Sequence, residues 1–263
     1  MKIELLSKSP GTHMTAWRNK MTGLADNTTK IKKLISTEKS QYLVFLSLSI
    51  AVMLLTGLIY FTNKLPFERF IGRINPLLAG IFIILLGAVL FTVLLSHSWF
   101  AIYKKGNLKG LYRSSGLAAI LGGIMILVDL KIVFPADTNT LLPASLLFYP
   151  AIGFFVEILF HVLPLSLLIV TLTSLFRNAR FENIIWTSIL LVALLEPVYQ
   201  TLWMGDRYPL WAVAYVGFHV FLINLFQLII FKRYDFISMY SFRLVYYLFW
   251  HIGWGYIRLK VLF

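Results

Sequence analysis

Residues 150–164, PAIGFFVEILFHVLP, decide how the rest of the sequence is interpreted. The segment is apolar except for Glu157 and His161, which are four residues apart and therefore share one face of a helix. Within a membrane span both side chains would lie where charge is costly, so they indicate a functional site. The other spans are expected to supply the partners of Glu157.

The composition of the 263-residue chain is that of a membrane protein. Hydrophobic residues make up 59% of it, charged residues 13%, and the mean hydropathy is +0.80, whereas a soluble domain is about 25% charged. Apolar runs of about 20 residues recur, which is the length needed to cross the bilayer. The predicted fold class is all-α, a polytopic transmembrane helix bundle of about seven or eight spans.

The sequence has no cysteine, which excludes disulfides, thiolate metal sites and a cysteine nucleophile. Its net charge of +13 is interpreted as basic loops beside anionic lipid. The expected partner is therefore the lipid bilayer. We expect no nucleic-acid binding, because no basic residues interleave with aromatic ones on a soluble module.

The chain divides into two parts. Residues 1–41 are predicted to form a basic, largely exposed tail without a secretory signal, with an amphipathic turn near 31–35 on the membrane surface. Residues 42–263 are predicted to form the transmembrane domain, with the candidate site in 142–259. The predicted spans are 42–62, 76–95, 115–134, 142–176, 183–203, 209–231 and 239–259.

The fourth predicted span is long and contains Pro143, Pro150 and Pro164. Proline kinks a span or breaks it, so this segment is either one helix or a re-entrant piece followed by a helix. The tail and the second, fourth and sixth loops carry most of the basic residues. The positive-inside rule therefore predicts a cytoplasmic N-terminus. It places the C-terminus outside unless an eighth span is hidden. The expected location is a bacterial cytoplasmic membrane, with the chain as a multi-pass protein.

Polar residues recur deep inside four consecutive predicted spans: Glu157, His161, Glu196, His219, Asn224, Arg243 and His251. The two glutamates, His219 and His251 each lie about a dozen residues into their spans, at a depth of about 15–20 Å. We expect these groups to meet at one level and to neutralise one another. Glu196 could then hold His161 as an imidazolium, and Arg243 either reaches the inner interface or contacts substrate. Asp129 and Lys131 are expected to form an interfacial pair.

The pattern favours a carboxylate base that activates water, supported by imidazoles. The sequence lacks the Gly-x-Ser-Gly, His-Glu-x-x-His and paired-aspartate patterns of other intramembrane proteases. Zinc bound by Glu157, His161 and one of His219 or His251 is an alternative. We favour a site without metal or other cofactor, because no short pairing places two imidazoles on one helix.

Three segments resemble the motifs of the CAAX-protease and bacteriocin-processing (CPBP, abortive-infection) family of glutamic intramembrane proteases. Residues 156–161 resemble its Glu-Glu-x-x-x-Arg motif, residues 215–219 its Phe-x-x-x-His motif, and residues 243–255 its final motif, in which Asn or Asp follows a His by four. The chain departs from these patterns at Val156, His161 and Gly255, where the family has Glu, Arg and Asn or Asp.

The resemblance implies a bundle of about eight helices and an intramembrane peptidase. Glu157 would activate water, with His219 and His251 as supports and His161 and Glu196 as further candidate catalytic residues. Asn224, Arg243 and Trp250 are predicted to contact a membrane-embedded peptide or protein substrate. The departures leave two alternatives open: a catalytically inactive relative that binds a membrane peptide or lipid, and a proton-coupled transporter with the same Glu/His relay.

Overall fold

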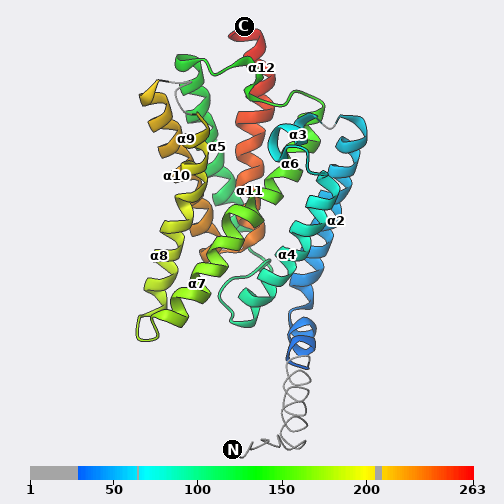
Figure 1. The fold of residues 1–263 in the computed structure, drawn as a ribbon, viewed down its shortest axis with the longest axis vertical. Helices are drawn as coiled ribbons and strands as arrows, with labels where there is room; N and C mark the ends of the chain where they lie inside the picture. The colour runs from blue at the N-terminus through cyan, green and yellow to red at the C-terminus, as the bar shows by residue number, and fades with distance from the viewer. Residues whose placement is uncertain (1–28, 64, 205–208) are drawn as a thin grey trace, which may run out of the picture.

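A computed structural model describes residues 29–63, 65–204 and 209–263, and the described residues form an all-α bundle (Figure 1). Six of the described helical segments are long and apolar enough to cross a membrane. The protein is therefore a multi-pass integral membrane protein, and the predicted fold class is confirmed. Most of the predicted 1–41 tail lies outside the described residues. Its last part is helical, with Ile31 and Ile35 exposed.

The helices of the first half begin and end near the predicted positions. They are α2 (Lys39–Thr62), α3 (Leu65–Ile71), α4 (Pro76–Ser96) and α5 (Leu108–Ile132). Asn75 and Asn107 cap the N-termini of α4 and α5 by accepting hydrogen bonds from backbone N–H groups. Because of its cap, α5 begins seven residues before the predicted span. The short helix α3 was not predicted.

The long fourth span is one continuous helical segment. It consists of α6 (Ala144–Val156), the π-helix η2 (Glu157–Val162) and α7 (Leu163–Leu175). The alternative of a re-entrant piece followed by a helix is therefore wrong. Pro164 is the second residue of α7. Because it has no N–H, it interrupts the backbone hydrogen bonds, and the helix widens into the π-helical turn before it.

The second half contains α8 (Phe181–Ala193), α9 (Leu195–Met204), α10 (Leu210–Arg233), α11 (Phe236–Tyr247), the π-helix η4 (Leu248–Trp254) and α12 (Gly255–Val261). The last three form one helical segment. It corresponds to the seventh predicted span, although it carries Arg243, Arg258 and Lys260 and is not one of the six more apolar helices. It runs through the middle of the bundle, with α11 in contact with α5, α6 and α10 (Figure 1).

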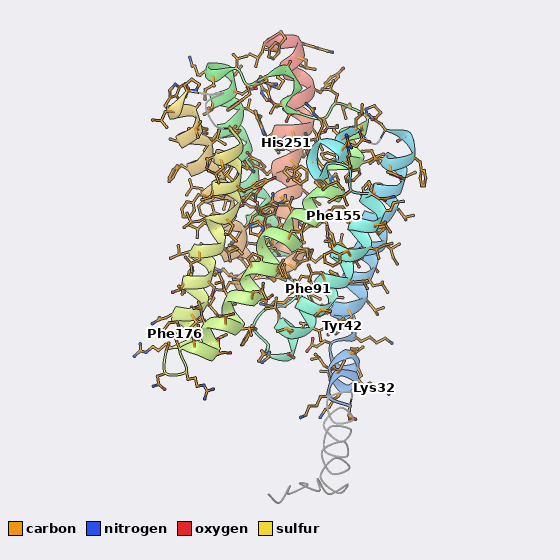
Figure 2. The ribbon with its side chains drawn as sticks, viewed as in Figure 1. Lys32, Tyr42, Phe91, Phe155, Phe176 and His251 are labelled. Carbon is orange, nitrogen blue, oxygen red and sulfur yellow. The ribbon has the colours of Figure 1, made fainter. Side chains whose placement is uncertain are left out.

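Small residues allow the close contacts around this central segment. A Cβ atom on Gly122 of α5 would lie 2.8 Å from Cβ of Phe249, so α5 and η4 can approach only because this residue is glycine. Aromatic side chains fill the other half of the core. The Phe91 ring lies 5.0 Å from that of Phe236, and the Phe67 ring 5.2 Å from that of Phe148 (Figure 2 labels Phe91 and Phe155 among the side chains).

A buried ion pair fixes the loop after α5. Asp129 is fully buried and accepts hydrogen bonds from Nε and Nη2 of Arg258 at 2.7 and 2.9 Å, and from the indole N–H of Trp254 at 2.6 Å. The expected pairing of Asp129 with Lys131 is therefore wrong, since the Lys131 side chain is exposed. Arg258 also donates to the carbonyl oxygens of Phe134 and Pro135, so it ties the loop to α12.

Candidate functional site

Glu157 lies at the centre of a buried polar cluster. Its Oε1 accepts a hydrogen bond from Nε of Arg243 at 2.5 Å and another from the Gln227 amide, and its Oε2 lies 2.8 Å from Nδ1 of His161. The four side chains come from η2, α10 and α11, and each is at most 4% exposed. Glu157 is thus paired with the guanidinium of Arg243. Because Arg243 is held in this buried cluster, it does not reach the membrane interface.

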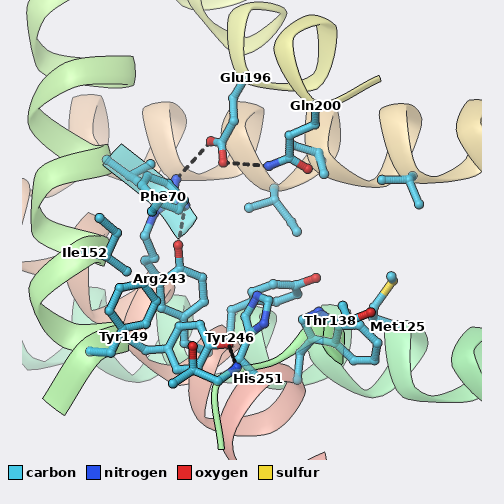
Figure 3. A pocket seen from close by; sticks show the side chains of 18 of the residues that line it. Phe70, Met125, Thr138, Tyr149, Ile152, Glu196, Gln200, Arg243, Tyr246 and His251 are labelled. Carbon is cyan, nitrogen blue, oxygen red and sulfur yellow. Dashed lines mark hydrogen bonds and ion pairs between the residues drawn. The ribbon is translucent and has the colours of Figure 1, made fainter. Parts of the chain in front are cut away.

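Glu196 of α9 contacts the same guanidinium from the other side. Its Oε2 lies 3.2 Å from Nη2 of Arg243, and its Oε1 accepts a hydrogen bond from Gln200 at 3.0 Å (Figure 3). The expected pairing of Glu196 with His161 is wrong, because His161 contacts Glu157 and Glu196 contacts Arg243. The two glutamates contact the same guanidinium, with Arg243 between them.

Local structure explains how this cluster forms. The π-helical turn is wider than an α-helical turn, which brings residues four apart closer to alignment, and His161 reaches Glu157 across it. Gly153 lies one turn earlier on α6. A Cβ atom there would come within 3.2 Å of Tyr247 and 3.5 Å of Cδ of Arg243. Gly153 therefore leaves room for the Tyr247 ring, which packs beside Arg243 against α6.

The two remaining histidines lie apart from this cluster. His219 has its Nε2 3.3 Å from the Tyr246 hydroxyl. The His251 ring stacks on that of Tyr149, with ring centroids 4.6 Å apart. Its Nδ1 forms a 2.6 Å hydrogen bond with Oδ1 of Asn139, which lies in the loop after α5. His251 follows Arg243 by two helical turns, or about 12 Å along the axis. The expectation that His251 lies level with Glu157 is therefore wrong.

A cavity of about 500 Å³ connects these groups. Its polar lining includes Glu196, Gln200 and Arg243 at one end and Tyr149 and His251 at the other (Figure 3). Its remaining walls are mostly apolar and aromatic, from α3, α5, α6, η2, α9, α10, α11 and η4. A volume of this size and a mostly apolar lining with a few converging polar groups are typical of a small-molecule site.

The cavity extends from α3 to α9. Arg69 and Phe70 of α3 and Thr138 and Thr140 of the loop after α5 line one part of it. Tyr199 of α9 lines another part and is 48% exposed. Because α9 belongs to one of the six span-capable segments, Tyr199 connects the cavity wall with a surface of the bundle that suits lipid contact.

The predicted site residues fall into two groups, those that line the cavity and those that do not. Its lining includes Glu196, His219, Arg243, Trp250 and His251. Three others are fully buried outside that lining: Glu157, His161 and Asn224. The Asn224 amide and Nε2 of His161 have no hydrogen-bond partner among the described residues. The prediction of a substrate contact for Asn224 thus has no geometric support, since its side chain does not reach the cavity.

Sequence reasoning missed three polar partners: Gln227, Gln200 and Arg258. Gln227 follows His219 by eight residues and Gln200 follows Glu196 by four, so each repeats along one helix face and could have been found by that spacing. Arg258 lay near the end of its span and carried no comparable signal.

No group of three His, Asp or Glu side chains is placed to hold a metal ion in the described ranges. The expectation of a site without metal or other cofactor stays a prediction. No protein-family model matches the sequence, and comparisons with curated proteins and with solved structures give no match. The resemblance to CPBP proteases thus rests on the three motifs alone.

Proposed function

We propose that the protein binds a small amphiphile from the membrane in the cavity between η2, α9, α10 and α11. One observation carries this proposal: an apolar, aromatic cavity of about 500 Å³ has Glu196 and Arg243 at one end, and Tyr199 in its wall is also 48% exposed on the surface of the bundle. An apolar chain would lie against the aromatic walls, and a polar head would contact Glu196 and Arg243.

A binding role fits the arrangement of charges. Glu157 is already neutralised by Arg243 and lies behind it. By the CPBP resemblance, the first Glu of the family's pair corresponds to Val156, and Val156 lines the cavity. The position that faces the cavity thus carries an apolar side chain that cannot activate water, which favours the non-hydrolytic alternative.

Identification of the amphiphile tests the proposal. The protein would be purified in phosphatidylcholine nanodiscs, and bound molecules would be counted by native mass spectrometry. Val220→Phe fills the cavity with a larger side chain, whereas Val89→Phe places the same change on the lipid-facing surface of α4, where Val89 is 63% exposed. We expect Val220→Phe to lose the bound amphiphile and Val89→Phe to keep it; equal occupancy in both variants would contradict the proposal.

The second candidate is an intramembrane peptidase. Three of its predicted catalytic residues, Glu196, His219 and His251, line the cavity, and this favours Glu196 over Glu157 as the base. In that case Glu196→Gln would abolish cleavage of a membrane peptide, a loss of much more than about tenfold, whereas Glu157→Gln would not remove the base. If only Glu157→Gln lost cleavage, Glu157 would be the base, as the sequence predicted.

A further inference from the structure

At the end of the cavity that Glu196 lines, the described side chains carry more negative than positive charge. Glu157 and Glu196 share one guanidinium, that of Arg243, and the described residues supply no other Lys or Arg to either carboxylate. His161 adds a contact to Glu157, but a neutral imidazole suffices for that hydrogen bond. One negative charge therefore remains unless a proton or a cation joins the cluster.

The remaining charge belongs to Glu196 rather than Glu157. Arg243 lies 2.5 Å from Glu157, which also accepts from Gln227 and His161, but 3.2 Å from Glu196. Nη2 of Arg243 divides its donors between Glu196 and Gln227, the latter at 3.0 Å. The Glu196 side chain is also 10% exposed and lines the cavity, whereas Glu157 is fully buried.

The walls around Glu196 suit a positive charge. Tyr199 follows Glu196 by three residues on α9, so the two share a helix face. Phe160, whose ring lies 5.8 Å from that of Tyr199, and Tyr247, whose ring contacts Arg243, line the same part of the cavity, and Phe148, Tyr149, Tyr246 and Trp250 line the rest of it. Aromatic faces attract a cation through their negative π faces. A cation placed here would also offset the cost of an ionised carboxylate inside the membrane.

We infer that the ligand is an amine, whose ammonium group binds beside Glu196 while its apolar chain extends along the aromatic walls. The inference rests on the proposed amphiphile-binding function and specifies the head group. The ammonium group is directed to the end of the cavity that Glu196 lines.

Three probes of equal chain length test the head group: octylammonium, octanol and octanoate, each added to the protein in phosphatidylcholine nanodiscs. Binding is measured by native mass spectrometry. We expect octylammonium to bind at least about tenfold more tightly than octanol, and octanoate not to bind. Glu196→Gln should remove the preference. The matched control, Glu182→Gln, should keep it, because Glu182 is exposed and bonds to Lys232 and Trp186 on the outer surface.

A second variant covers the case in which Glu196→Gln does not fold. Tyr199→Leu keeps every charge and removes one aromatic wall, so it should weaken octylammonium binding and leave octanol binding unchanged. If octanol or octanoate binds at least as tightly as octylammonium, the inference is overturned. The charge of Glu196 would then be neutralised by a proton, and the cavity would still bind amphiphiles. If Val220→Phe displaces none of the probes, the proposed function itself fails.

Discussion

At the scale of single residues, Arg243 holds the polar cluster together. Its guanidinium donates to Glu157, Glu196, Gln227 and Tyr247, which come from four helical elements. A guanidinium can satisfy several acceptors at once because its donors point in fixed, divergent directions. A lysine at this position would not reproduce these contacts.

We expect Arg243→Met to destabilise the protein by about 3–5 kcal/mol, because both glutamates would lose their cation in a buried site. Reversible unfolding in bicelles, followed by circular dichroism during titration with dodecyl sulfate, would measure the change. Lys232→Met is the matched control, since its ion pair with Glu182 is solvent-exposed and should contribute little. Equal stability of the two variants would show that Arg243 does not organise the cluster.

The amino-acid types predicted which residues belong to the site, but they predicted less well where each residue lies along the bundle. An ionisable side chain inside an apolar run is costly, so Glu157, Glu196 and Arg243 could each be selected from sequence as site candidates, although Arg243 was not expected to pair with the glutamates. Depth was harder to predict. The seventh span was expected to begin at Met239, but the helix begins at Phe236, and nothing in the spacing of residues shows how far one helix is shifted along its axis against another.

At the scale of elements, the contact between α5 and the central helical segment positions one wall of the cavity. Gly122 allows this contact, and the Tyr246 carbonyl oxygen lies 3.7 Å from where a Gly122 Cβ would be. A side chain at this position would push the segment away from α5 and move Tyr246 and Trp250. These two residues line the cavity.

We expect Gly122→Ala to reduce stability by about 1–3 kcal/mol, because the new Cβ would overlap Phe249. Gly123→Ala is an internal control, since nothing lies within 4 Å of the added atom, and the better helix propensity of alanine should leave its stability unchanged or slightly higher. Unfolding curves for the two variants check this. A larger loss for Gly123→Ala would contradict the packing described for α5.

The loop after α5 provides the other element-scale prediction. Asp129→Asn should weaken the contact with Arg258 and increase backbone hydrogen exchange at residues 133–140, because Arg258 also holds that loop through two carbonyl oxygens. Lys131→Gln should leave exchange unchanged, as the Lys131 side chain is exposed. Exchange measured by mass spectrometry would reveal an error in the pairing if the Lys131 variant had the larger effect.

The run lengths of apolar residues predicted the helices well because hydrocarbon requires every backbone N–H and C=O to be bonded within a helix. The predicted 76–95 span ends one residue before α4 does. The same reasoning failed for α3, since a seven-residue helix lies below the length that a bilayer demands. This reasoning therefore could not predict the part of the cavity wall that α3 contributes.

At the scale of the whole molecule, the distribution of charge predicts orientation. The loop between α4 and α5 carries Lys104 and Lys105, and α5 begins with Lys109 and Arg113. We expect this end of the bundle and the N-terminus to face the cytoplasm. Reporter fusions at Gly106 and at residue 137 should lie on opposite sides of the membrane, and the same side for both would contradict this topology.

The central claim is that an amphiphilic amine occupies the cavity, and photolabelling tests it most directly. An octylammonium probe with a diazirine near its head group would be irradiated with the protein in nanodiscs, and the adducts mapped by peptide mass spectrometry. The account predicts adducts at Glu196, Tyr199 or Tyr246 that unlabelled octylammonium suppresses. Adducts confined to lipid-facing residues such as Leu54 and Val89, unaffected by the competitor, would contradict it.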